Sequence, residues 1–192
     1  MELAPLDAAS PQLRDRQLLA GNPFFSPAAP FPPKARGRRG FDGTQIAVLL
    51  RENARKRNSH VIFSNDEGRT WTAPREVPAA LTGDRHIARY APDGRLFITF
   101  RDTTLHSPTA GDWVGWVGTY QDIVDGKEGQ YRVRLMDNTK DKDCAYPGLE
   151  LLPDGTFVTT TYGHWSKDED PYIVSVRFKL EELDWLLAQS RK

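Results

Sequence analysis

The chain has 192 residues, 39% of them hydrophobic, which is enough to form the core of one domain and excludes a chain that is disordered as a whole. Its 26 basic and 26 acidic residues balance, which argues against a general basic surface for nucleic acid and against an acidic tail. A single cysteine, Cys144, excludes an intrachain disulfide, and no Cys/His cluster has zinc-ligand spacing, so we expect neither a metal nor a cofactor.

Residues 1–40 differ in composition from the rest of the chain. Five prolines between residues 23 and 33 interrupt any periodic pattern, and a basic cluster follows among glycines, at Lys34, Arg36, Arg38 and Arg39. We interpret this stretch as a Pro/Arg-rich arm and, because no aromatic residues are interleaved with the cluster, as a solvated linker more than a phosphate-binding site. The sequence shows no signal peptide and no apolar run of membrane-spanning length, so we expect no membrane contact and, as written, a cytoplasmic location.

Residues 41–180 read as short strands separated by Gly, Asp, Pro and Asn turns, so we predict an all-β domain. A short amphipathic helix follows at Leu180 to Gln189, with Leu183, Leu186 and Leu187 on one face, and residues 181–192 form the helix and tail. The predicted strands are Gln45 to Leu50, His60 to Ser64, His86 to Tyr90, Leu96 to Arg101, Trp113 to Tyr120, Tyr131 to Met136, Gly148 to Leu152, Phe157 to Tyr162 and Tyr172 to Phe178. Trp113 and Trp116 are three positions apart, so they should face opposite sides of their strand.

Two sequence patterns recur in this region. An Asp-Gly turn precedes a strand at Asp42, Asp93 and Asp154, a spacing somewhat wider than the ~40 to 50 residues of propeller repeats. The second pattern, S-x-D-x-G-x-T-W, is formed by Ser64, Asp66, Gly68, Thr70 and Trp71 and suits a tight turn with polar side chains bonded to its backbone. It resembles the Asp box of sialidases and other BNR-repeat β-propellers, where its role is structural.

The resemblance implies about three blades of a six-bladed sialidase-like β-propeller. The blades would be Gln45 to Pro78, Asp84 to Asp137 and Cys144 to Phe178. Known propellers have about four to eight blades, because fewer cannot surround an axis. Either a second copy completes the ring as a homodimer, or the chain is a fragment of a longer protein.

Residues 143–155 resemble the late sialidase motif in which an Ala-Tyr-Ser sequence precedes a strand and an Asp-Gly turn. The resemblance assigns the catalytic nucleophile to Tyr146, although Pro147 replaces the serine and Tyr162-Gly163 replaces a Tyr-Glu pair. Arg85 stands where the family has the glutamate that accepts the phenol proton. The family arginines that bind the substrate carboxylate correspond to Arg101, Arg85 and Arg51; Arg132 and Arg134 are weaker candidates.

The family's general acid comes from a first blade that this sequence does not contain. Asp102 and Glu52 are substitutes by position, but Asp102 and Arg101 are neighbours on a strand and should point to opposite faces. Tyr146 could equally fill a β core, and Arg85 and Arg101 could form ion pairs with Asp84 and Asp102. The four histidines lack ligand spacing.

The resemblance implies an exo-α-sialidase that releases a terminal sialic acid or related acidic sugar, so the expected partner is a sialylated or acidic glycan, with no nucleic acid and no membrane. A non-catalytic carbohydrate- or protein-binding partial propeller is the alternative, because the acid and the glutamate are missing. A truncated, inactive fragment is a third reading. Family members that act on external glycans are usually exported, so the location stays open.

Overall fold

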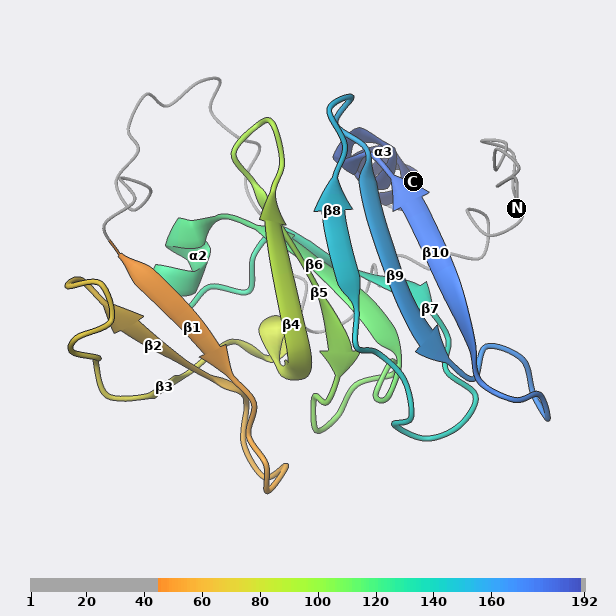
Figure 1. Ribbon diagram of the computed structural model, residues 1–192, viewed down its shortest axis with the longest axis horizontal. Helices are drawn as coiled ribbons and strands as arrows, with labels where there is room; N and C mark the ends of the chain where they lie inside the picture. The colour runs from red at the N-terminus through yellow and green to blue at the C-terminus, as the bar shows by residue number, and fades with distance from the viewer. Residues whose placement is uncertain (1–44, 191–192) are drawn as a thin grey trace.

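The computed structural model describes residues 45–190, which form three antiparallel sheets and a C-terminal helix (Figure 1). The first sheet has the order β1 (Ile46–Leu50), β2 (His60–Ser64), β3 (Arg75–Glu76). The second sheet runs in chain order through β4 (Gly83–Tyr90), β5 (Leu96–Asp102), β6 (Trp113–Gly118) and β7 (Tyr131–Met136). The third has the order β10 (Tyr172–Phe178), β9 (Phe157–Gly163), β8 (Gly148–Leu151). The all-β class and the three groups of strands predicted from the sequence are confirmed.

One Asp-Gly turn connects β4 to β5 in the second sheet, and another connects β8 to β9 in the third sheet. Gly94 and Gly155 have φ values of 88° and 83°, a left-handed conformation that favours glycine. In both turns the aspartate accepts a 3.0 Å hydrogen bond from a backbone amide two residues later, on Arg95 and Thr156. The third such pair, at Asp42, lies outside the described residues, as does the predicted arm over residues 1–40.

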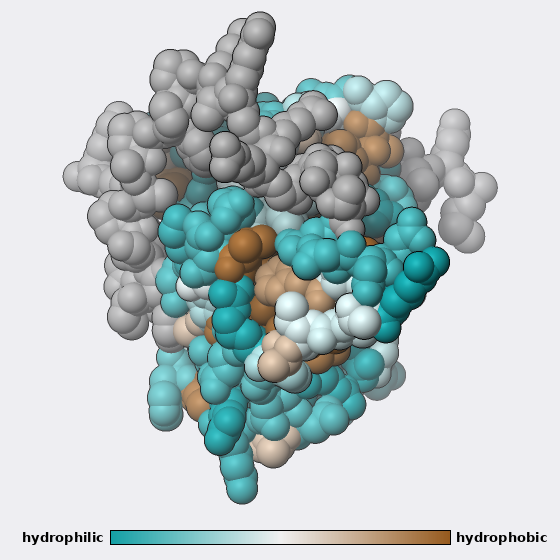
Figure 2. All heavy atoms as spheres, turned by 90° about the vertical axis from the view of Figure 1, so that its left-hand side faces the viewer, coloured by the Kyte–Doolittle hydropathy of each residue, from teal (hydrophilic) through white to brown (hydrophobic). Residues whose placement is uncertain are grey.

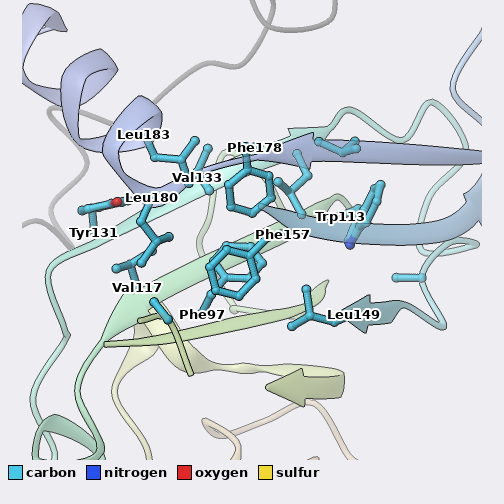
Figure 3. Close-up of a cluster of buried hydrophobic side chains, with 14 of the residues drawn as sticks. Phe97, Trp113, Val117, Tyr131, Val133, Leu149, Phe157, Phe178, Leu180 and Leu183 are labelled. Carbon is cyan, nitrogen blue, oxygen red and sulfur yellow. The ribbon is translucent and has the colours of Figure 1, made fainter. Parts of the chain in front are cut away.

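The larger hydrophobic core lies between the second and third sheets and under the C-terminal helix α3 (Leu180–Ser190). Figure 3 shows three phenylalanine rings at its centre, one from β5, one from β9 and one from β10. The centroid of Phe97 lies 5.3 Å from that of Phe157 and 4.8 Å from that of Phe178. Leu180 and Leu183 of α3 close the same cluster. Burial of these rings therefore holds the two sheets and the helix together.

A second core lies between the first and second sheets. It includes Val61 of β2, Trp116 of β6 and Leu81 of the short 3-10 helix η1 (Ala79–Leu81). Trp113 belongs to the other cluster, so the two tryptophans do face opposite sides of β6 as predicted. Both are fully buried, so neither lines a surface groove.

Helix α3 is also fixed by a polar contact. Asp184 accepts two 2.9 Å hydrogen bonds from the guanidinium group of Arg95, in the β4–β5 turn, and one of 2.7 Å from the hydroxyl of Tyr131 in β7. Bidentate arginine–carboxylate pairs fix orientation as well as distance. The helix is therefore attached to the second sheet at a defined position.

The structure differs from the sequence prediction at the end of β6. The predicted strand extended to Tyr120, but β6 ends at Gly118 and Tyr120 begins the helix α2 (Tyr120–Asp125). A capping box causes the change, because Thr119 accepts from the Asp122 amide while the Asp122 carboxylate accepts from the Thr119 amide. The two-residue strand β3 was not predicted, and α3 begins at Leu180, as the leucine pattern predicted.

Candidate functional site

The Asp box forms the turn between β2 and β3. The Asp66 carboxylate accepts from the amide and the hydroxyl of Thr70 at 2.8 and 2.6 Å, and from the hydroxyl of Ser64 at 2.8 Å. These bonds, chiefly those from Thr70, lower the pKa of Asp66 to about 2. Gly68 has a φ of 84°, and Trp71 donates its indole N–H to the Gly68 carbonyl at 3.0 Å. All five residues hold the turn.

The predicted nucleophile Tyr146 meets Arg85 at the seam between the second and third sheets. Tyr146 precedes β8 and Arg85 lies at the start of β4, and these two strands are neighbours in Figure 1. Arg85 donates a hydrogen bond from Nη2 to the Tyr146 hydroxyl, and its guanidinium carbon lies 3.9 Å from the ring centroid. Tyr146 is 56% exposed, so this contact is open to a ligand from outside and the phenol is not a core residue.

The backbone on both sides of this contact is in an unusual conformation. Arg85 has a φ of 65° and Ala145, just before Tyr146, a φ of 60°. A non-glycine residue held in this region costs about 1–3 kcal/mol, and such positions gather at functional sites. The β4–β5 register also shifts between Asp84 and Ile87. This irregularity turns Arg85 out of the regular alternation of β4 and toward Tyr146.

Arg101, at the end of β5, is turned inward to Asp84. Its Nε and Nη2 atoms donate to the two carboxylate oxygens at 2.9 and 2.8 Å, and Nη1 donates to the carbonyls of Lys142 and Cys144. Asp84 is 1% exposed and also accepts from Arg55 at 2.8 Å. Burial alone would raise the pKa of Asp84, but the hydrogen bonds and charges of the two arginines outweigh it and lower the pKa. Arg101 therefore ties the second sheet to the loop before β8.

Arg51 and Arg85 line the same pocket, which has a volume of about 460 Å³. The pocket lies between β1 and β4, and its apolar wall is formed by Ala47, Leu49 and Ile98. His86 also lines it. Figure 2 views the molecule from the side of the first sheet and shows hydrophobic side chains gathered in the middle of a largely hydrophilic face. The pocket thus combines two guanidinium groups with an apolar wall.

The two carboxylates considered as general acids serve the structure. Asp102 is fully buried and accepts from Ser107 and Thr109 at 2.7 and 2.8 Å and from the guanidinium group of Arg132. Glu52 accepts from the backbone amides of residues 54 and 56 at 2.8 and 2.7 Å and so shapes the loop after β1. Arg101 and Asp102 do face different partners, as the strand alternation predicts. Arg134 pairs with Asp112 at 3.2 Å.

A group of three residues beside Tyr146 was not recognised from the sequence. The hydroxyl of Tyr162 donates to Asp143 Oδ1 at 3.0 Å, and His164 Nε2 lies 3.0 Å from Asp143 Oδ2. The Tyr162 ring stacks on the Tyr146 ring, with 6.1 Å between centroids and 25° between planes. The sequence signal was weak: Tyr162 occupies the place of the tyrosine in the family's Tyr-Glu pair, and Asp143 stands in the same motif as Tyr146.

Within this group the carboxylate and the phenol shift each other's pKa. Hydrogen bonds from His164 and then Tyr162 lower the pKa of Asp143. Burial, followed by the bond to Asp143, raises the pKa of Tyr162. At neutral pH the group therefore contains an ionised carboxylate next to a protonated phenol.

Among residues 45–190, no group of three or more His, Cys, Asp or Glu side chains is arranged to hold a metal ion. No helix in the same range combines the length and hydrophobicity that crossing a bilayer requires.

No protein-family model matches the chain, and no curated protein matches it. The crystal structure of a protein of unknown function from Dyadobacter fermentans DSM 18053 is similar, with a TM-score of 0.55 and 18% sequence identity. The match covers 69% of this chain and 34% of that one, so the chain spans about a third of the length of its structural neighbour. At this identity the likeness concerns the fold alone.

Proposed function

We propose that the three sheets are blades of a sialidase-like β-propeller and that the chain binds a terminal acidic sugar, such as sialic acid, and hydrolyses its glycosidic bond. One observation carries the proposal: two of the predicted carboxylate-binding arginines, Arg51 and Arg85, line a single pocket, and Arg85 also contacts the predicted nucleophile Tyr146.

The lining of the pocket is chemically complementary to an acidic sugar. Its volume of about 460 Å³ lies within the roughly 300–1,000 Å³ of small-molecule sites. Guanidinium groups bind carboxylates in a bidentate manner, and the wall of Ala47, Leu49 and Ile98 offers an apolar surface to the C–H face of a sugar ring. Arg101, whose donors are engaged by Asp84 and two carbonyls, would support the site without touching the substrate.

The reaction would use a phenol as nucleophile. The anomeric centre of sialic acid bears a carboxylate, and a neutral attacking group avoids bringing a second anion to it. For this reason sialidases are an exception to the two-carboxylate scheme of most glycosidases. The resemblance assigns the nucleophile to Tyr146, which is exposed beside the pocket arginine Arg85.

A fluorogenic α-sialoside tests the proposal. The purified wild-type chain should release fluorophore, and a variant with both Arg51→Gln and Arg85→Gln should lose turnover because nothing holds the substrate carboxylate. Arg89→Gln is the matched control, since Arg89 is an exposed arginine of β4 paired with Glu150. Tyr146→Phe tests the assigned nucleophile directly. A wild-type chain that releases no fluorophore would refute hydrolysis of this substrate.

Binding without turnover is the second candidate function. It is favoured by the structural use of Asp102 and Glu52, which leaves the site without the general acid sought in the sequence. Calorimetric titration with sialyllactose distinguishes the cases: saturable binding lost in the double arginine variant, with no release of sugar, would support a binding module. Neither binding nor turnover would support an inactive fragment, in keeping with the third of a longer chain that the structural match covers.

The same proposal extends to assembly. Each sheet ends in strands that, within residues 45–190, have one hydrogen-bonded neighbour, as β1 and β10 do. Such edges invite pairing with another chain. Two copies with three blades each would supply the six blades of a sialidase ring as a symmetric dimer.

A further inference from the structure

The seam between the second and third sheets holds two phenols with different surroundings. The hydroxyl of Tyr146 is contacted by the cation of Arg85, whereas the hydroxyl of Tyr162 is contacted by the carboxylate of Asp143 at 3.0 Å. A phenol that attacks carbon must lose its proton to a base in hydrogen-bond reach. A guanidinium group has no lone pair to accept that proton, and a carboxylate has.

The carboxylate of Asp143 is held in place from its other side. His164 Nε2 lies 3.0 Å from Oδ2, while Tyr162 uses Oδ1. His164 is itself buried and fixed through its backbone, since its amide donates to Asn138 at 3.1 Å and its carbonyl accepts from the Thr139 amide at 2.8 Å. Asp143 has a side chain that is 53% exposed, so its free lone pairs face solvent. The arrangement of phenol, base and orienting group is the one that activates a nucleophile.

We infer that Tyr162, with Asp143 as its proton acceptor and His164 as the positioning residue, is the nucleophile of this site, and that Tyr146 and Arg85 bind the substrate. The inference rests on the proposed hydrolysis and changes the assignment that the resemblance made. Tyr146 and Tyr162 stack, so a sugar that contacts one ring lies next to the other.

The Tyr162 oxygen bonds to the anomeric carbon as the bond from that carbon to the leaving oxygen breaks; the phenol proton moves to Asp143, and the leaving oxygen takes a proton from water. In the second half, a second water attacks the anomeric carbon and gives up a proton to the solvent, which replaces the proton that the leaving oxygen took. Tyr162 leaves the carbon and recovers its proton from Asp143, which restores the enzyme.

Other charged groups that act on this cluster are Lys140, which lies near Asp143, and Arg101, whose charge acts on Tyr162. Both are cations, and both favour the ionised state of the group that they act on. As the pH is lowered, Asp143 takes up a proton and can no longer accept one from Tyr162, so the activity should fall at acidic pH.

A trapping experiment locates the nucleophile. A 3-fluorinated sialosyl fluoride reacts with the nucleophile but hydrolyses slowly from it, so mass spectrometry of peptides identifies the labelled tyrosine. A label on Tyr162 supports the inference, and a label on Tyr146 overturns it while leaving the proposed hydrolysis intact. Absence of label together with absence of turnover on the aryl sialoside overturns both.

Kinetics supply the second test. Tyr162→Phe and Asp143→Asn should each lower kcat at least about a hundredfold, whereas Tyr146→Phe should mainly raise KM. His164→Gln should move the acidic limb of the pH profile upward, because His164 is the main group that lowers the pKa of Asp143. Full kcat in Tyr162→Phe, in a variant whose circular dichroism matches wild type, contradicts the inference.

Discussion

Asp84→Asn should destabilise the folded chain more than any exposed carboxylate substitution. The wild-type carboxylate is 1% exposed and balances two cations, Arg101 through two hydrogen bonds of 2.9 and 2.8 Å and Arg55 through one of 2.8 Å. The asparagine keeps the shape and removes the negative charge. Arg101, with a side chain 11% exposed, is then left as a buried cation without a counterion.

The size of the destabilisation depends on which arginine can reach solvent once the carboxylate is lost. Breaking a buried ion pair by removing one partner costs about 3–5 kcal/mol. Arg55 has a side chain that is 31% exposed, and it lies in the loop after β1, so it can turn to solvent and Arg101 carries most of the cost. We therefore expect a loss near the lower end, about 3 kcal/mol, which corresponds to a fall in Tm of about 6–12 °C for a chain of this size.

Thermal unfolding followed by circular dichroism at pH 7 measures this fall. The control is Asp125→Asn, because Asp125 pairs with Lys127 on the surface, where the Lys127 side chain is 64% exposed, and exposed pairs contribute little. If the two variants unfold at the same temperature, the buried ion pair of Asp84 and Arg101 does not stabilise the contact between the second and third sheets.

Three further outcomes are expected. Burial lowers the pKa of His86 to about 4, so the contribution of this imidazole to the free energy of unfolding rises from about pH 4 to 6.5. Burial raises the pKa of Asp112 to about 6, so the contribution of this carboxyl group falls as the pH rises from about 4 to 6. In urea unfolding, Asp112→Asn should gain stability relative to wild type across that window, and parallel pH curves would contradict this. Asp66→Ala removes the acceptor of the Thr70 amide, so hydrogen exchange at Thr70 should accelerate while exchange at the Asp-Gly turn amide of Thr156 stays unchanged; equal protection in both proteins would show that the Asp box does not depend on its carboxylate. Light scattering at micromolar concentration should give twice the mass of one chain, and a stable, well-folded monomer would rule out closure by two copies.

The strands could be predicted because their signals are local. Strand-like runs bounded by turn residues placed β2, β7 and β10 at their observed bounds, and the grouping of the strands matches the sheets that the structure forms. The error at the end of β6 was also local, since the capping pair of Thr119 and Asp122 was in the sequence but was outweighed by the apolar run before it.

The site could be predicted only in part, because its contacts join residues far apart in the chain. The resemblance placed Arg85 at the position of the group that partners the phenol, but the residues themselves gave no sign of the left-handed backbone and the register shift in β4 that bring Arg85 to Tyr146. The sequence offered Arg101 both as a substrate ligand and as an ion-pair partner of Asp84 or Asp102, and the pair with Asp84 is the one that forms. It missed Asp143 because an aspartate in a loop has many ordinary roles, and its contacts with Tyr162 and His164 appear only once β9 is folded against that loop.

The contact between Arg85 and Tyr146 spans two sheets that share a hydrophobic core but belong to different hydrogen-bonded ladders. A ligand that binds both residues would link the two sheets, and its binding free energy would add to the free energy needed to separate them. Saturating sugar should therefore raise the temperature at which the two sheets part, and a screen of acidic sugars by thermal shift would identify ligands even for a chain that catalyses no reaction.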